Sequence, residues 1–253
     1  MNPVVRSLFF AFASLLHPRM LWLMIWPMLV AVAIWGAGLF IAGARIVLML
    51  SGWMQQWMQS GTFFVRWDLT DAIAIAAKIL IVLAFIPLVW LTALFILSVF
   101  GMQAMVEHVA SRSYPQLARR HGGSFAGSLM NGVAALAGLA VLGAMSIPFW
   151  LIPPLWLAIP VAIMAWVNQR VLRYDALAEH ASPDEMRTIF SAQRGSLYVL
   201  GAILALLAYV PLVGFVAPVL FGLAFIHFLL GELEALRQAP IEGEVLRGQG
   251  SRL

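Results

Sequence analysis

The sequence contains no cysteine, a single lysine and few charged residues of any kind. The lack of cysteine excludes disulfides, thiolate catalysis and sulfur-ligated metal sites. Asp, Glu, Lys and Arg make up 10% of the 253 residues, whereas a globular domain carries charge on about a quarter of its positions. Because 63% of the residues are hydrophobic, the composition indicates a membrane protein.

Four stretches of at least 25 residues lack Asp, Glu, Lys and Arg altogether. Residues 20–44 and 79–106 each exceed the roughly 20 apolar residues that cross about 30 Å of hydrocarbon as a helix, and they predict two long transmembrane helices. Residues 121–169 and 195–231 are longer, and prolines interrupt each of them near its middle. This pattern predicts two proline-broken helical hairpins, and we treat residues 1–253 as a single polytopic membrane domain of the all-α class.

The prolines place the turns of these hairpins. The first arm of the first hairpin is expected to run from Ser128 to Ile147, the turn to occupy 148–154, and the second arm to start at about Trp156. In the second hairpin the first arm is expected to run from Ser196 to Tyr209, the turn to occupy 211–218, and the second arm to start at Val219. Its first arm has only 14 residues before Pro211, short of a full crossing, so the hairpin either spans the bilayer or re-enters it from one side.

Two further segments are expected to lie in the membrane interface. Near the N-terminus, a short amphipathic helix would turn Leu8, Phe9, Phe12 and Leu16 toward lipid; the alternative is a cleavable signal peptide ending near Ala-Phe-Ala at 11–13. Residues 51–59 predict a second interfacial helix with one aromatic and methionine face, made of Trp53, Met54, Trp57 and Met58.

Arginine is distributed unevenly across this topology. If the N-terminus is cytoplasmic, twelve arginines lie inside, and only Arg45, Arg66 and Lys78 lie outside or near the outer surface. The positive-inside rule therefore predicts that both termini are cytoplasmic. It also explains the net charge of +4 without nucleic acid as a partner.

A cytoplasmic helix-turn-helix is predicted between the hairpins. Ser182-Pro-Asp-Glu185 is typical of a capping box with proline at the first helical position, and it would start a short helix. Before it, Asp175 and Glu179 are like charges four residues apart, which an isolated helix disfavours. We expect them to pair with arginines from elsewhere, the candidates being Arg119, Arg120 and Arg237.

An anion site is the main chemistry that these residues permit. Arg119 and Arg120, followed by His121-Gly-Gly-Ser124, suggest two guanidiniums beside flexible backbone at a helix N-terminus. The alternative is an arginine-rich loop that binds lipid phosphate or fixes the topology. Arg19, at the mouth of the first span, is a third anion-binding candidate with the same alternative.

Polar residues within or beside the spans are candidates for a pore lining: Lys78, Glu107, Arg112, Asn168 and His227. Each has a structural alternative. Lys78 would reach outward to Asp71, which follows Asp68 at the start of the second span, and a neutral His227 would hydrogen bond to a facing helix. Asn131 and Asn168 would form hydrogen bonds either at helix ends or between helices. The five histidines show no metal-ligand spacing, so we expect no metal and no cofactor.

Several short motifs occur in an order similar to that of the CysZ-type sulfate permeases and the broader etoposide-induced-protein group. They are His17-Pro18 with Pro27, Glu107 with Arg112, Asp184-Glu-Met-Arg-Thr188, Tyr209-Val-Pro-Leu212 and Ala217-Pro218. The resemblance implies two transmembrane helices, two hemi-penetrating hairpins, a bacterial inner membrane, homo-oligomers and passive sulfate uptake.

One departure concerns the sulfate site implied by the resemblance. That family follows its entry proline with Gly-Leu-Arg or Gly-Ile-Arg, whereas Pro18 is followed here by Arg19-Met20-Leu21. We therefore expect a permease for a small oxyanion, sulfate first; a non-transporting scaffold, assembly or lipid-handling protein is the alternative. The carboxylates lie in loops and at helix ends, so an enzyme is not expected.

Overall fold

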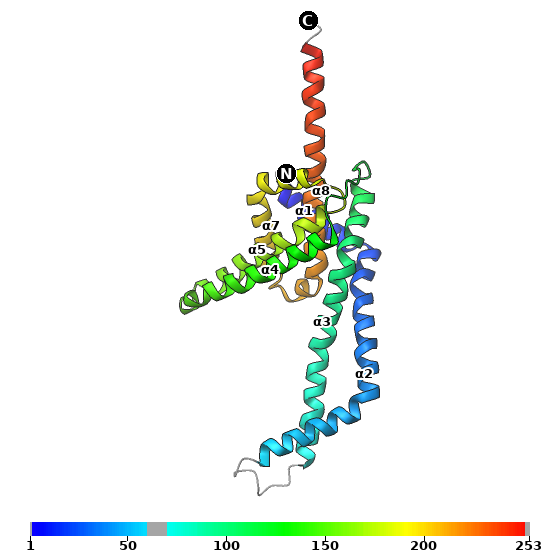
Figure 1. The fold of residues 1–253 in the computed structure, drawn as a ribbon, viewed down its shortest axis with the longest axis vertical. Coiled ribbons are helices and arrows are strands. Elements are labelled where there is room, and N and C mark those ends of the chain that lie inside the picture. The colour runs from blue at the N-terminus through cyan, green and yellow to red at the C-terminus, as the bar shows by residue number, and fades with distance from the viewer. Residues whose placement is uncertain (1, 60–69, 251–253) are drawn as a thin grey trace. The chain divides into compact units, whose positions relative to one another are not determined.

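The computed structural model describes residues 2–59 and 70–250, and every regular element in this part of the chain is a helix (Figure 1). In chain order the elements are α1 (Pro3–Leu15), α2 (Pro18–Gln59), α3 (Thr70–Ser113), α4 (Phe125–Ser146), the 3₁₀ helix η1 (Ile147–Leu151), α5 (Leu155–Leu177), α6 (Pro183–Ala192), α7 (Arg194–Leu207) and α8 (Pro211–Gly250). Five of them are long and apolar enough to cross a membrane. The prediction of an all-α, multi-pass membrane protein is confirmed.

Residues Trp22–Val99 form one compact unit, built from most of α2 and α3. Its small core contains Ala31, Val89 and Ala93, with Trp35 and Phe85 packed against them. The Trp35 indole also donates a hydrogen bond to the Thr92 hydroxyl (2.8 Å), which satisfies a polar group within the apolar pair. These are the two long helices that the charge-free stretches predict, and most of their remaining apolar side chains are exposed, as lipid contact requires.

The interfacial helix expected at 51–59 is the last part of α2 rather than a separate element. α2 has 42 residues, so at 1.5 Å per residue it is about 63 Å long, twice the hydrocarbon thickness. The predicted aromatic face is present, because the rings of Trp53 and Trp57 lie 5.6 Å apart. Asp68, Arg66 and the side chain of Met58 lie outside the described residues.

Residues Met1–Leu21 and Phe100–Leu253 form a second compact unit, with α8 at its centre. Of the 18 most apolar consecutive residues in α8, 67% are buried, whereas only 11% are buried in the corresponding stretch of each of the other four candidate spans. Helices α1, α5 and α7 pack against this segment. The expectation of a single domain stays a prediction.

The N-terminal helix is amphipathic as expected. Val4, Ser7, Ala11 and Leu15 recur at intervals of three and four residues, and this buried stripe marks the face by which α1 packs on α8. Phe9 (66% exposed), Phe12 and Leu16 (74% exposed) point away from the unit, and Leu8 is half-buried.

The first hairpin is confirmed. α4 and α5 pack side by side, joined by η1 and the proline-rich turn at 152–154 (Figure 1). Ser124 caps α4 by accepting a hydrogen bond from the Gly127 N–H (3.0 Å). The interhelical role expected for Asn131 is also present, because its side-chain amide donates to the Arg170 carbonyl (2.7 Å).

The turn of the second hairpin is shorter than expected, so the assignment of 211–218 to it is wrong. α7 ends at Leu207 and α8 begins at Pro211, so the turn occupies only residues 208–210. Proline is favoured at the first position of a helix, where its missing N–H costs nothing, and α8 then continues through Pro218. α7 has 14 residues, about 21 Å, and it makes a 75° bend with α6; whether the hairpin crosses or re-enters stays a prediction.

The short helix between the hairpins is confirmed as α6. Ser182 accepts from the Glu185 N–H (3.3 Å), and the Glu185 carboxylate accepts from the Ser182 N–H (2.7 Å). Together these bonds complete the capping box, with Pro183 at the first helical position. The helix-turn-helix therefore follows from local sequence.

Candidate functional site

Two histidines and two arginines gather where α1, α2 and α3 have their ends. His17 lies in the break between α1 and α2, Arg19 in the first turn of α2, and His108 and Arg112 in the last turns of α3. The imidazole rings of His17 and His108 are 4.6 Å apart between centroids. We call these four residues the cationic cluster.

Local sequence explains the position of His17. Pro18 cannot continue α1 but fits the first position of α2, so the chain breaks between Leu16 and Pro18. His17 then accepts hydrogen bonds from the backbone N–H groups of the first turn of α2, which have no partner within the helix. Its Nδ1 accepts from the Arg19 N–H (3.2 Å), and its carbonyl accepts from the N–H groups of Met20 (2.8 Å) and Leu21 (3.1 Å).

The cationic cluster carries positive charge that no carboxylate in the described part of the chain neutralises by an ion pair. Arg19 and Arg112 are exposed, and neither makes an ion pair with any residue in the described part of the chain. Burial lowers the pKa of His108, and the nearby charges of His17, Arg112 and Arg19 lower it further. Donors of this kind, without a carboxylate among them, suit a small oxyanion, because guanidinium groups form charge-assisted hydrogen bonds to its oxygens.

Arg119 and Arg120 have a different environment. Arg119 forms ion pairs with Glu107 and with Glu179 (2.8 Å), and Arg120 pairs with Glu185 (2.8 Å). The expected pairing of Glu179 is thereby confirmed. The expected pairing of Asp175 is wrong: it makes no ion pair with a described residue, and its Oδ1 is buried without a hydrogen-bond partner there.

The loop after these arginines does not offer free backbone donors. The N–H groups of His121, Gly122 and Gly123 donate to the carbonyls of Glu179 (3.0 Å), Ala181 (3.0 Å) and Ala178 (2.8 Å) in the turn between α5 and α6. His121 has a φ of 46°, and a Cβ on Gly122 or Gly123 would collide with the α5–α6 turn. The nest-like sequence therefore joins the loop to α5, and the anion-binding role of Arg119 and Arg120 stays a prediction.

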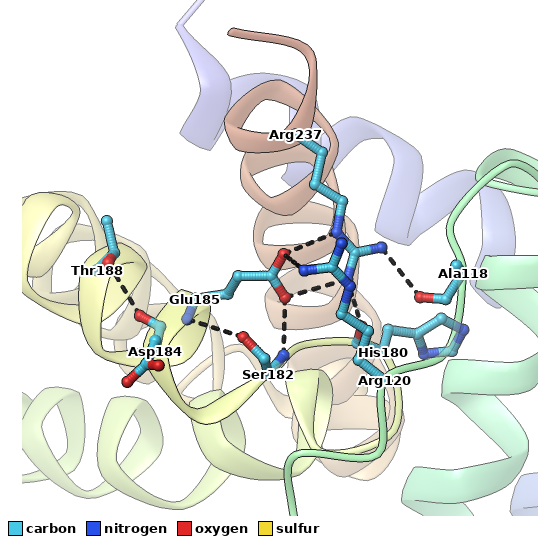
Figure 2. A network of polar contacts seen from close by, with 8 residues as sticks. All are labelled: Ala118, Arg120, His180, Ser182, Asp184, Glu185, Thr188 and Arg237. Carbon is cyan, nitrogen blue, oxygen red and sulfur yellow. Dashed lines mark hydrogen bonds and ion pairs between the residues drawn. The ribbon is translucent and has the colours of Figure 1, made fainter. Parts of the chain in front are cut away.

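Arg237 of α8 is at the centre of a network shown in Figure 2. Its guanidinium donates to both carboxylate oxygens of Glu185 (2.9 and 3.1 Å) and to the carbonyls of Ala118 (3.0 Å) and His180 (2.7 Å). We expected Arg237 to pair with Asp175 or Glu179, and that was wrong, because the capping box presents Glu185 to α8 instead. Hydrogen bonds from Arg237 are the main reason that the pKa of Glu185 is lowered to about 2.

The pore-lining candidates divide by environment. Arg112 belongs to the cationic cluster, whereas Glu107 is bound by Arg119. Asn168 has a buried side-chain nitrogen without a hydrogen-bond partner in the described residues. Lys78 lies in the Trp22–Val99 unit and is exposed; the ion pair expected with Asp71 is not formed, within the residues that the structure describes.

His227 is 5% exposed, inside the central part of α8. Its Nε2 is 2.9 Å from the Ser14 hydroxyl of α1, and its carbonyl accepts from the Tyr114 hydroxyl (3.1 Å). The expected hydrogen bond to a facing helix is therefore confirmed. Its role as a pore-lining residue stays a prediction.

Sequence reasoning singled out Arg19 and Arg112 separately but missed His17 and His108 as neighbours. The only available signal was the His17-Pro18 break, because a contact between residues 17 and 108 leaves no trace in local periodicity.

A family model described as "Sulfate transporter CysZ/Etoposide-induced protein 2.4" matches residues 7–218. No curated protein and no solved structure matches the chain.

Proposed function

Since the chain belongs to the sulfate transporter CysZ/etoposide-induced protein 2.4 family, we propose that it is a membrane permease for a small oxyanion, sulfate first. The family description names a transporter rather than an enzyme. A bacterial inner membrane, cytoplasmic termini and a homo-oligomer complete the proposal, in line with the excess of arginine on one side of the predicted topology.

The cationic cluster is the observation that carries this proposal. Arg19 and Arg112 have no carboxylate partner among the described residues, whereas Arg119, Arg120 and Arg237 all do. An anion that reaches Arg19 and Arg112 meets no bound carboxylate, whereas at the other three arginines it would have to compete with one. The former site is therefore much the better suited to reversible binding.

The altered motif at the start of α2 fits this arrangement. The N–H groups of Arg19, Met20 and Leu21 all donate to His17, so this backbone is not free to bind an anion. A glycine that lets an anion approach the backbone would bring little benefit here. The anion would be held by side chains, with Arg19 and Arg112 supplying charge and the two imidazoles supplying further polar contacts.

The route across the membrane is proposed to run between subunits. The first hairpin carries many exposed apolar side chains on α4, among them Leu129, Met130 and Leu136. Such a surface requires either lipid or a second copy of the chain. In this proposal the charge-free hairpins of neighbouring subunits line the path that leads to the cationic cluster.

Uptake of radiolabelled sulfate into proteoliposomes of the purified chain tests the proposal, with selenate, phosphate and chloride as competitors. We expect saturable uptake that selenate blocks. Arg19→Ala and Arg112→Ala should each weaken sulfate binding by about ten-fold or more, since a hydrogen bond to a charged group contributes roughly 1.5–3 kcal/mol. Arg45→Ala is the matched control, because Arg45 is an exposed arginine on the same helix as Arg19.

A non-transporting scaffold or assembly protein of the same fold is the second candidate. It is favoured by the carboxylate partners of Arg119 and Arg120, two of the three arginines expected to bind an anion. Absence of flux from folded, correctly inserted protein would support it, and sulfate binding that Arg19→Ala and Arg112→Ala leave unchanged would remove both residues from the proposed site.

A further inference from the structure

A second group of unpaired arginines lies where α5 meets α7. Arg170 and Arg173 lie in the last two turns of α5, and Arg194 is the first residue of α7, which packs against α5. None of these three arginines makes an ion pair with a residue in 2–59 or 70–250. Like charges gathered without a carboxylate repel each other, so this group is more stable with an anion bound than without one.

The side chains of this group are held in place. The Arg173 guanidinium stacks over the ring of Phe190 on α6, 4.7 Å from its centroid. The Nε of Arg170 is buried, and within the described chain it has no hydrogen-bond partner. A donor that has lost its hydration without gaining a partner costs free energy, so its position indicates a ligand atom or an ordered water.

The bend between α6 and α7 brings Arg194 to the same place. Gln193, at the bend, is anchored by its amide, which donates to Glu232 of α8 (2.7 Å), and by its side-chain oxygen, which accepts from the Ser196 hydroxyl (3.0 Å). α7 therefore starts at Arg194, with no side-chain cap, and the positive end of its dipole adds to the field of the arginines. The space beside Gly195 is open, with nothing within 4 Å of an added Cβ.

The neighbouring surface is apolar and continues along α7. Val199 (53% exposed) and Leu206 (48% exposed) share the outer face of this helix with Gly195, at helical spacing. The arginines lie near the last turn of the candidate span Leu155–Leu177, the depth at which a charged headgroup meets the acyl chains. A ligand that fits both features carries a phosphate on an apolar body.

We propose that Arg170, Arg173 and Arg194 bind the phosphate of an anionic phospholipid, whose acyl chains lie along the exposed face of α7. The shared chemistry is a phosphate oxyanion, which a headgroup or free phosphate could supply; the apolar face of α7 favours the lipid. This site is separate from the cationic cluster, and it includes neither Arg19 nor Arg112.

Native mass spectrometry of the full chain in detergent, titrated with phosphatidylglycerol or phosphatidylcholine, tests this proposal. Wild-type protein is expected to bind phosphatidylglycerol more tightly than phosphatidylcholine. Arg194→Gln should weaken phosphatidylglycerol binding roughly five-fold. The double variant that carries both Arg173→Gln and Arg194→Gln should weaken it roughly 25-fold. Arg187→Gln is the matched control and should leave binding unchanged, since this arginine is 82% exposed and pairs with Asp184 on α6.

Arg194→Gln alone keeps the test decisive if the double variant fails to fold, because Arg194 is exposed. Phosphatidylglycerol binding to Arg194→Gln that equals wild type would overturn the proposal. A third arm adds inorganic phosphate as competitor: no displacement of the lipid at millimolar phosphate supports a lipid site, and full displacement would assign the site to a free oxyanion. None of these readouts depends on sulfate transport.

Discussion

Glu185→Gln is the sharpest test of how the second unit is held together. The Glu185 side chain is 13% exposed, and it accepts hydrogen bonds from Arg237, Arg120 and the Ser182 N–H (Figure 2). Glutamine can keep the capping box, since its side-chain oxygen still accepts from Ser182. The substitution therefore keeps the cap, but it removes the negative charge and replaces the oxygen that accepts from Arg237 Nε and Arg120 with an amide nitrogen, which only donates.

The size of the effect follows from the pKa of Glu185. A fall from its ordinary 4.5 to about 2 in the folded protein corresponds to about 3 kcal/mol of folding free energy. Because the folded-state pKa is the lower one, this stability is fully present above pH 4.5 and is lost as the pH falls toward 2. We expect Glu185→Gln to lower the free energy of unfolding by about 2–3 kcal/mol at pH 7 and to remove that acid-dependent loss.

This free energy is measured by titrating the protein in detergent micelles with SDS and recording the fluorescence of its ten tryptophans. Asp184→Asn is the matched control: Asp184 is 91% exposed beside Glu185, and we expect a change below about 0.5 kcal/mol. The reasoning would be refuted if Glu185→Gln and wild type unfolded alike at pH 7, or if both lost stability equally between pH 4.5 and 2.

Three further predictions concern helix packing, a buried hydrogen bond and anion binding. Gly201→Ala would place a Cβ 2.6 Å from a backbone oxygen of α5, so the free energy of unfolding in SDS should fall by about 1–3 kcal/mol. Gly195→Ala in the same helix meets open space and should be neutral or stabilising, so equal losses in the two variants would contradict this reasoning. Ser14→Ala removes the side-chain hydroxyl partner of the buried His227 imidazole and should cost about 1–2 kcal/mol in the same assay, and an unchanged unfolding curve would argue against that bond. Burial and neighbouring positive charges lower the pKa of His108, so this imidazole is neutral at pH 8 and gains charge only below its ordinary 6.5. Sulfate affinity should therefore rise as the pH falls from 7 toward 5, and His108→Gln should flatten that rise. Identical pH profiles for the variant and wild type would exclude His108 from the site.

The arginines of this chain fall into two classes that the sequence does not distinguish. Arg119, Arg120, Arg187 and Arg237 have carboxylate partners, while the other arginines whose side chains are described, Arg6, Arg19, Arg45, Arg112, Arg170, Arg173 and Arg194, have none among the described residues. The first class holds loops and helices together. Our two proposals place anions only at arginines of the second class, a small oxyanion at α2 and α3 and a lipid phosphate at α5 and α7.

The sequence alone determined the features that depend on neighbours along the chain. The two long spans and the first hairpin follow from the absence of charge over more than 20 residues, because lipid excludes unpaired charge whatever the fold. The capping box at Ser182 and the exposed face of α1 follow from spacings of three and four residues. The start of α8 could also have been predicted, since Pro211 suits the first position of a helix better than a long turn.

Only the tertiary structure decided which distant groups meet. Arg237 lies 52 residues from Glu185, and His227 lies 213 residues from Ser14. Which arginine reaches a given carboxylate depends on how α8 packs among α1, α5 and α6, and several arginines were equally suitable partners on charge alone. The ring contact between His17 and His108 arises in the same way, because close packing of helix ends sets it and no local periodicity encodes it.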